Sequence, residues 1–209
     1  FTLFPLTEKV RSSVLEEGQP LFSLGSDPRS DLDMSPSARK ERAEAMGFDT
    51  SRVWYHGTPE GRFCEFDTEM STESGELFFS SSPRVASDFA QYRRTAYEPS
   101  VIPAYARGNL LIVDGRGSAI RKAEAEAKQP GMKYGETIRD FARRKGYDGI
   151  VFSNVVDDAG GPGFPQNSDV LALFDPSNIR SVNAEFDPAK DGSPNLMYSD
   201  VAAAKPPAK

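Results

Sequence analysis

The sequence predicts an α+β fold, in which short strands are interrupted by helices at irregular intervals. The apolar segments have the length of strands, and they do not alternate one for one with helices as they would in regular βαβ units. The chain also has neither a GxGxxG nor a GxxxxGK[ST] motif. A nucleotide bound here is therefore not expected to sit in a Rossmann or P-loop site.

The expected elements follow from apolar runs, caps and breakers along the chain. The expected strands are residues 53–56, 76–80, 101–106, 110–113, 149–152, 170–174 and 179–182. The expected helices are residues 36–46, 83–92, 119–128 and 136–145. The stretch 154–168 is rich in Gly and Pro and is expected to be a loop, and the first strand is expected to stop at Gly57.

Composition places these elements in one domain of ordinary size with polar ends. We assign residues 35–186 to that domain, residues 1–34 to a leader or linker, and residues 187–209 to a flexible tail. The chain has 209 residues, a formal net charge of −6 and a single cysteine, Cys64. The negative charge disfavours broad nucleic-acid binding, and the cysteine usage suits a cytoplasmic protein. No apolar run approaches the ~18 residues of a membrane span, so no membrane partner is expected.

The first candidate for chemistry is His56, which is the only histidine of the chain. It ends an apolar strand and precedes Gly57 and Thr58, and such positions often display reactive groups. A half-buried surface imidazole is the plainer interpretation, and both stay open. Because the chain has one histidine and one cysteine, a zinc site of the Cys/His type is excluded.

The second candidate is the segment 75–92, GELFFSSSPRVASDFAQY. Phe78 and Phe79 are adjacent on a strand, so one is expected to face the core, and the other could stack on a flat ligand. The helix that follows begins with a Ser-Pro cap and carries Phe89 and Tyr92. Core packing by Phe78 and Phe79 is the plainer interpretation, and both stay open.

The third candidate is Asp169, which stands directly before an apolar strand. A carboxylate at the mouth of a buried strand is able to stabilise a developing positive charge. The alternative is a polar residue that only marks the strand boundary. Three residues of the preceding loop compete with it for an acidic or polar role: Asp157, Asp158 and Gln166.

Together these segments resemble the ADP-ribosyltransferase domains of the branch that includes diphtheria-type toxins and poly(ADP-ribose) polymerases. That branch has a His on the first strand, an aromatic residue on a later strand and an acidic residue near the end. Here YHGT at 55–58, GELFFS at 75–80 and DVLALFDPSNI at 169–179 match these motifs, with Phe78 where the branch usually has Tyr. The closer similarity, over about residues 52–186, is to the ADP-ribosyltransferase domains of phage and prophage polyvalent proteins.

The resemblance implies a fold of split mixed and antiparallel β-sheets with flanking helices, and it implies NAD as the substrate without a metal. The catalytic residues that it implies are His56, Phe78 and Asp169. The NAD-binding residues that it implies are Tyr55, Gly57, Thr58, Phe79, Ser80, Phe89 and Tyr92. The loop at 154–168 would recognise the acceptor, with Phe164 and Gln166 as candidate contacts.

In this comparison, His56 would bind a ribose hydroxyl and the Gly57 backbone would hold the carboxamide of nicotinamide. Phe78 would sandwich the nicotinamide ring together with Phe89 or Tyr92, and Ser80 is a weaker candidate contact to the amide. Asp169 would stabilise the ribose cation that forms when nicotinamide leaves.

The acidic position departs from the family pattern. The usual Glu or Gln lies five positions before the Asp of the FDP segment, and counting back from Asp175 reaches Val170. Asp169 is one residue away, and one step along a strand turns a side chain to the opposite face unless a bulge re-aims it. The acidic role of Asp169 is therefore a hypothesis.

The resemblance implies an NAD-dependent mono-ADP-ribosyltransferase, a phage or prophage effector that modifies a component of a bacterial host in the cytoplasm. Its acceptor is not identified, and the acidic composition favours a protein over nucleic acid. The missing glutamate leaves open a module that binds NAD or ADP-ribose without catalysis. NAD hydrolysis, with water as the acceptor, is the third alternative.

Overall fold

The computed structural model describes residues 32–59, 65–66, 75–92, 99–157 and 166–196. The chain divides into two units, Phe1–Met34 and Ser35–Lys209, and every helix and strand described lies in the second.

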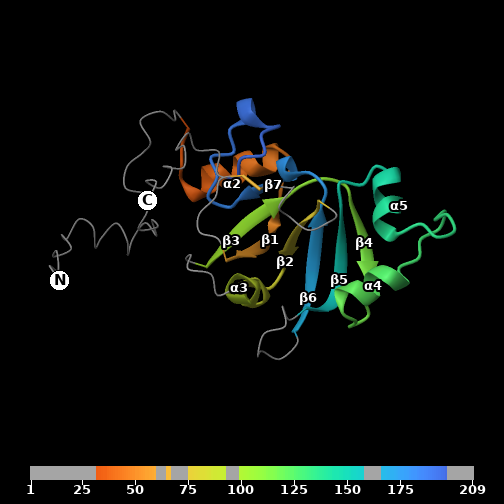
Figure 1. Ribbon diagram of the computed structural model, residues 1–209. Coiled ribbons are helices and arrows are strands. Elements are labelled where there is room, and N and C mark those ends of the chain that lie inside the picture. Colours follow the sequence, from red (N-terminus) through yellow and green to blue (C-terminus); the bar gives the residue numbers. More distant parts are fainter. Residues whose placement is uncertain (1–31, 60–64, 67–74, 93–98, 158–165, 197–209) are drawn as a thin grey trace, which may run out of the picture. The chain divides into compact units, whose positions relative to one another are not determined.

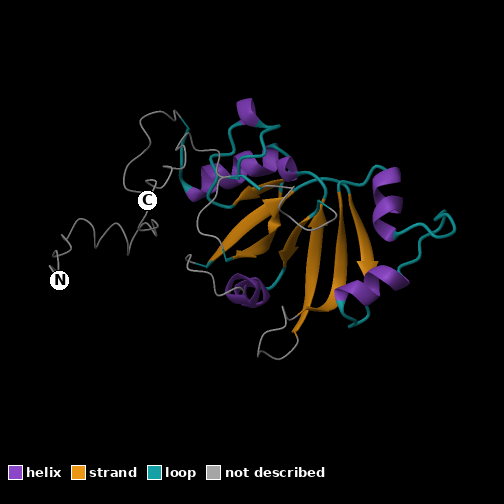
Figure 2. Ribbon diagram, in the orientation of Figure 1, coloured by secondary structure: helices purple, strands orange, loops and turns teal. Residues whose placement is uncertain are grey.

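The second unit is built on one seven-stranded sheet with the strand order β4-β5-β6-β2-β1-β3-β7 (Figures 1 and 2). The strands are β1 (Asp49–Thr58), β2 (Leu77–Ser80), β3 (Ser100–Ala106), β4 (Leu110–Asp114), β5 (Gly149–Asp157), β6 (Gln166–Leu173) and β7 (Ile179–Ser181). The helices are α2 (Pro36–Ala45), α3 (Pro83–Tyr92), α4 (Ile120–Glu126) and α5 (Ile138–Arg144), and two short 3₁₀ turns are η1 (Pro176–Asn178) and η2 (Pro188–Lys190). Among the described strands, β4 and β5 are the one parallel pair, so the predicted α+β class is confirmed.

The sheet is weakest between β1 and β2, which we call the seam. In the described strands, the only residue pair across the seam is Tyr55 with Ser80. On its other side β2 pairs with β6 at four positions, from Leu77 with Leu173 to Ser80 with Val170. The seam thus separates the half β4-β5-β6-β2 from the half β1-β3-β7, as the split sheets of the resemblance imply.

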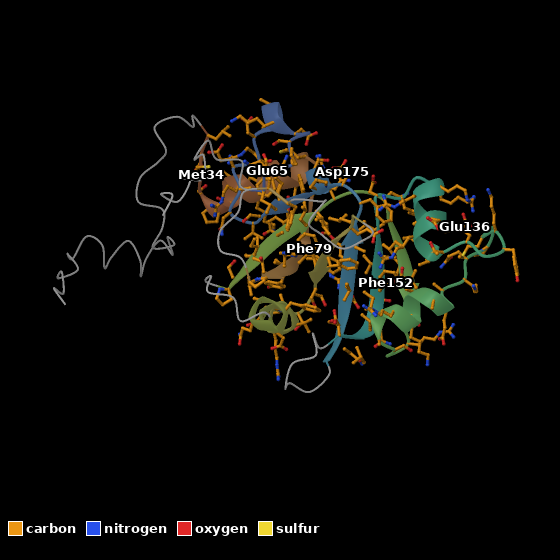
Figure 3. All side chains as sticks on the ribbon, in the orientation of Figure 1. Met34, Glu65, Phe79, Glu136, Phe152 and Asp175 are labelled. Atoms are coloured by element: carbon orange, nitrogen blue, oxygen red, sulfur yellow. The ribbon has the colours of Figure 1, made fainter. Side chains whose placement is uncertain are left out.

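Alternation along the strands gives the sheet two different faces. The Phe78 face is the one on which Val170 and Ala172 pack with buried side chains of α4 and α5, and Phe78 packs against the same cluster. The Phe79 face is the one on which Phe79, Leu171 and Trp54 form a second core. Both cores are apolar and their largest residues are almost fully buried, as the interior positions of Phe79 and Phe152 illustrate (Figure 3).

Two expected boundaries were wrong. Gly57 does not end the first strand but lies within β1, because it has no side chain and the backbone of α3 packs directly on it. The expected loop 154–168 is strand at both ends, since β5 continues to Asp157 and β6 begins at Gln166. The strands keep pairing across a bulge between Phe152 and Val155, where Asn154 adopts a positive φ of 53°.

The expectation of a flexible tail at 187–209 was wrong for residues 187–196. Leu196 is 1% exposed and belongs to the core of the Phe79 face. Arg180 is also 1% exposed, and its guanidinium donates hydrogen bonds to four backbone carbonyls of this segment. A polar composition therefore concealed a segment that is fixed through its backbone.

A buried carboxylate joins β2 to α5. Glu76, directly before β2, is 1% exposed and forms ion pairs with Arg139 and Arg143 of α5. Arg139 also pairs with Glu124 of α4, and its guanidinium lies 5.4 Å from the centre of the Phe78 ring. The network thus ties α4 and α5 to the strand that carries Phe78.

We predict that Glu76→Ala lowers the free energy of unfolding by about 3 kcal/mol, because the substitution leaves two partly buried guanidinium groups without their shared carboxylate. The control is Glu126→Ala, which removes an exposed i, i+4 ion pair with Lys122 and is expected to cost less than about 1 kcal/mol. Urea denaturation followed by circular dichroism measures both values. Equal effects of the two substitutions would contradict a structural role for the Glu76 network.

Candidate functional site

His56 lies at the seam, where the pairing between β1 and β2 does not continue. Its Nδ1 is 2.8 Å from the backbone carbonyl oxygen of Phe78. A carbonyl oxygen only accepts hydrogen bonds, so Nδ1 carries the proton in this contact. In the neutral ring the other nitrogen, Nε2, is then a hydrogen-bond acceptor, which suits a hydroxyl donor.

Aromatic rings surround the imidazole on the Phe79 face. Phe66 packs edge-on against it with ring centres 4.9 Å apart, and Phe79 lies at 5.4 Å. Burial lowers the pKa of His56 below its ordinary value, and the hydrogen bond to Phe78 opposes this shift without cancelling it. The enclosure therefore favours the neutral ring and its fixed tautomer.

Gly57, the next residue, allows α3 to approach β1 very closely. A β-carbon at this position would lie 1.7 Å from the carbonyl oxygen of Ala86 and 3.0 Å from the backbone nitrogen of Ala90. Only glycine fits this contact without moving the helix. The same helix carries Phe89, which is 41% exposed, so a large aromatic side chain is available to a ligand beside the glycine.

Phe78 and Ser80 project from the face opposite to His56, because Phe79 lies between them in the alternation of β2. His56 is therefore joined to the backbone of Phe78, while their rings point to opposite sides of the sheet.

Tyr55 is paired with Ser80 and shares its face, and Gly57 follows on that face. Ser80 Oγ accepts a hydrogen bond from the backbone N–H of Ser82, which precedes α3.

Val170 stands at the position where the resemblance implies an acidic residue. It pairs with Ser80, lies on the Phe78 face and is 3% exposed among apolar neighbours. Two residues earlier on the same face, Ser168 is 6% exposed, and within the described part of the chain its Oγ has no hydrogen-bond partner. Position 170 of β6, beside Ser80 on the Phe78 face, thus carries an apolar side chain where the resemblance implies a carboxylate.

Asp169 points to the Phe79 face and is held by three elements. One carboxylate oxygen pairs with Arg52 of β1, and the other accepts the backbone N–H of Asn154 at 2.8 Å. The Asp169 N–H donates to Ser81 Oγ at 2.9 Å, and the Arg52 guanidinium lies 4.1 Å above the Trp54 ring. Desolvation acts to raise the pKa of Asp169, but hydrogen bonds from Arg52 and Asn154 outweigh it and hold the pKa below its ordinary value.

The remaining predicted residues are placed less completely. Thr58 is 6% exposed at the end of β1. Asp157 at the end of β5 pairs with Gln166 at the beginning of β6. The Gln166 side chain lies outside the described part of the chain. The same holds for Tyr92 at the end of α3, and Phe164 and Asp158 lie outside the described residues.

No group of three or more His, Cys, Asp or Glu side chains in the described part of the chain is placed to hold a metal ion. None of the described helices combines the length and the apolar character that crossing a membrane requires.

Comparison with known proteins identifies the family. Residues 50–187 match the family model described as ADP-ribosyltransferase in polyvalent proteins. The chain belongs to this family. No curated protein and no solved structure matches the chain. The family match spans β1 to β7, and it includes the seam, His56 and the region of Val170.

Two residues around the site of this ADP-ribosyltransferase domain were missed in the sequence. Phe66 contacts His56, but it lies in a charged stretch without strand periodicity, so nothing in the pattern marked it. Arg52 was not singled out in the sequence, and its pairing with Asp169 joins residues 117 positions apart. Long-range ion pairs of this kind leave no local signal.

We predict that the imidazole of His56 titrates below the ordinary histidine pKa of about 6.5, because the protonated ring would be desolvated. The unfolded chain takes up this proton first, so the stabilising contribution is complete above pH ~6.5 and is lost as the pH falls through the folded-state value. A ¹H–¹⁵N NMR titration measures the pKa directly, because the chain has one histidine. An ordinary or raised pKa, or a proton on Nε2 of the neutral ring, would contradict this assignment.

Proposed function

We propose that the domain is an NAD-dependent mono-ADP-ribosyltransferase. One observation carries the proposal: the seam brings His56, the Phe78 backbone and the α3-packed Gly57 together within a domain of the ADP-ribosyltransferase family. The nicotinamide ring would lie on the Phe78 face beside Phe78, with Phe89 or Tyr92 of α3 on its other side. The Gly57 backbone would bind the carboxamide, with Ser80 as a further contact.

The ribose would lie at the seam beside His56, whose Nε2 would accept a hydrogen bond from a ribose hydroxyl. Tyr55, Thr58 and Phe79 would support this region of the site from β1 and β2. Because burial favours the neutral ring and the Phe78 carbonyl fixes its tautomer, the imidazole would orient the sugar by accepting a hydrogen bond at Nε2. Catalysis then depends chiefly on positioning the reacting groups.

In the reaction, the bond between C1′ of the ribose and the nicotinamide nitrogen breaks, and its electron pair leaves with nicotinamide. The sugar passes through an oxocarbenium-like state, and an acceptor nucleophile forms the new bond to C1′ and loses its proton. A carboxylate normally stabilises such a cation. With Val170 at the usual position, we expect slow turnover and single transfer.

The acceptor is proposed to be a protein of a bacterial host, modified in the cytoplasm after delivery by a phage or prophage. The net charge of −6 disfavours nucleic acid, whose phosphates would be repelled. The segment 154–168, with Phe164 and Gln166, would contact the acceptor. Within the described part of this segment, Asp157 and Ser168 are on the Phe78 face with Val170.

A second candidate function is NAD or ADP-ribose binding without catalysis, and the buried Val170 is the observation that favours it. Hydrolysis of NAD is the third. Incubation with labelled NAD and bacterial lysate separates the three. Nicotinamide release with label on macromolecules supports transfer, release alone supports hydrolysis, and NAD binding without release supports the binding module.

We predict that His56→Ala lowers kcat/KM for nicotinamide release by about a hundredfold or more, because the ribose loses its orienting contact. The control Tyr147→Phe removes a hydroxyl from a residue packed in the core beside α5 and is expected to leave the rate unchanged. Reverse-phase chromatography measures released nicotinamide. Full activity in His56→Ala, with a wild-type protein that turns over NAD, would refute the site assignment.

Asp169 is proposed to act by positioning, since its carboxylate is engaged by Arg52 and Asn154 on the Phe79 face. We expect Asp169→Ala and Arg52→Ala to reduce kcat/KM by similar factors, and Asp169→Asn to restore part of the loss through its remaining oxygen. A direct catalytic role predicts otherwise. It would abolish turnover in both Asp169 variants and leave Arg52→Ala near the wild-type rate.

A further inference from the structure

Residues 187–196 form a segment that we call the C-terminal strap. It begins with the 3₁₀ turn η2 and ends at Leu196, whose carbonyl oxygen accepts a hydrogen bond from the Ser181 N–H of β7 at 2.9 Å. The strap lies almost entirely outside the family match, which ends at residue 187. It is nevertheless joined to the domain by backbone contacts and by a buried side chain.

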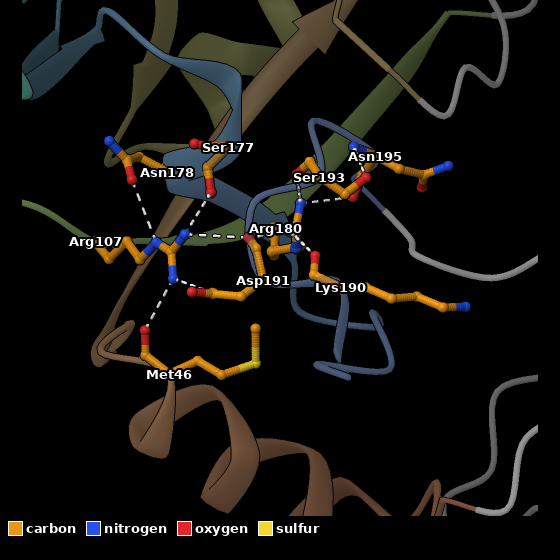
Figure 4. Close-up of polar contacts among 9 residues, drawn as sticks. All are labelled: Met46, Arg107, Ser177, Asn178, Arg180, Lys190, Asp191, Ser193 and Asn195. Carbon is orange, nitrogen blue, oxygen red and sulfur yellow. Dashed lines mark hydrogen bonds and ion pairs between the residues drawn. The ribbon is translucent and has the colours of Figure 1, made fainter. Parts of the chain in front are cut away.

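Arg180 on β7 fixes the course of the strap. Its Nη1 donates to the carbonyls of Ser193 and Asn195, and its Nη2 donates to those of Lys190 and Asp191 (Figure 4). The guanidinium is almost completely buried, so removing it would leave four carbonyls without their charged donor. Arg180 therefore determines where residues 190–195 lie.

The strap in turn reaches the surroundings of His56. Asn195 forms an antiparallel bridge with Glu65. The residue after Glu65 is Phe66, whose ring packs edge-on against His56 at 4.9 Å and against Phe79 at 5.5 Å. Leu196, the residue after Asn195, lies in the same apolar cluster as Phe79 and Trp54.

We propose that the C-terminal strap is a working part of the His56 site, in which Arg180 holds Asn195, Asn195 holds Glu65, and the adjoining Phe66 fixes the imidazole against the seam. Arg180 and Asn195 are positioning residues, since neither touches the ring. The consequence for turnover rests on the proposed function, but the effect on the imidazole does not. A domain limited to the family match would lack the strap and hold His56 loosely.

The test compares the full chain carrying Arg180→Ala with the same chain carrying Arg107→Ala. Arg107 is the matched control because it is a mostly buried arginine that, like Arg180, donates to the carbonyl of Asp191. Its hydrogen bonds within the described residues go to Met46, Ser177, Asn178 and Asp191 (Figure 4). Arg107 thus contacts the strap at Asp191, and none of its hydrogen bonds within the described residues goes to Ser193 or Asn195.

The readout is the NMR spectrum of the single histidine, whose ring protons are shifted by Phe66 and Phe79 and whose nitrogens report the tautomer. We expect Arg180→Ala to move the ring-proton shifts towards those of an exposed histidine and to mix the two tautomers. We expect Arg107→Ala to leave the spectrum as in the wild type. If the wild-type protein turns over NAD, Arg180→Ala should also raise KM about tenfold.

An unchanged His56 spectrum in a folded Arg180→Ala protein would overturn the proposal, as would an equal change in Arg107→Ala. If Arg180→Ala does not fold, Asn195→Pro decides by the same readout, because it removes the N–H that donates to Ser193 Oγ, constrains the backbone at the bridge residue and keeps Arg180. A normal imidazole spectrum in Asn195→Pro would then overturn the proposal. Absence of NAD turnover in the wild type would count against the proposed function alone.

Discussion

The hydrogen bond from His56 Nδ1 to the Phe78 carbonyl is the contact on which the arrangement of this site depends. It lies where β1 and β2 cease to pair through their backbones, and a side chain takes the place of the missing backbone donor. The bond fixes the tautomer of the ring and holds the two halves of the sheet together at the point where they diverge. One interaction therefore sets the tautomer of the imidazole and joins β1 to β2 at the seam.

The surroundings of the seam explain why several unrelated residues are needed there. Gly57 lets the backbone of α3, the helix that carries Phe89, pack directly on β1. On the opposite face, Phe66 and Phe79 enclose the imidazole and disfavour its charged form. On the Phe78 face, the Glu76 network fixes the helices that pack around Phe78. Each contact restricts the position of a group that would meet the dinucleotide.

Much of this fold could be predicted because its signals are local. Glycine and Ser-Pro caps marked the helices, and apolar runs marked the strands, including the consecutive pair β3 and β4. The wrong expectations arose where tertiary contacts override composition. Gly57 looked like a stop although α3 packs on it, and the polar residues 187–196 looked like a tail although Arg180 binds their carbonyls. The residues of the candidate site could be predicted where the motif of the resemblance is contiguous in the sequence, as at residues 55–58.

The acidic position shows the limit of sequence reasoning most clearly. Side-chain alternation along β6 places Val170 beside Ser80 on the Phe78 face and Asp169 on the Phe79 face. A bulge that could re-aim Asp169 was left open in the sequence, but the observed bulge lies in β5. Asp169 keeps its charge by pairing with Arg52, a contact between distant strands. Neither the partner nor the location of the bulge could be read from residue order.

The most direct test of this account is a crystal structure of the protein with NAD or a non-hydrolysable analogue. The account predicts a nicotinamide ring on the Phe78 face between Phe78 and Phe89 or Tyr92, its carboxamide on the Gly57 backbone and a ribose hydroxyl within hydrogen-bond distance of His56 Nε2. A dinucleotide bound away from the seam, or a nicotinamide ring on the Phe79 face, would contradict it.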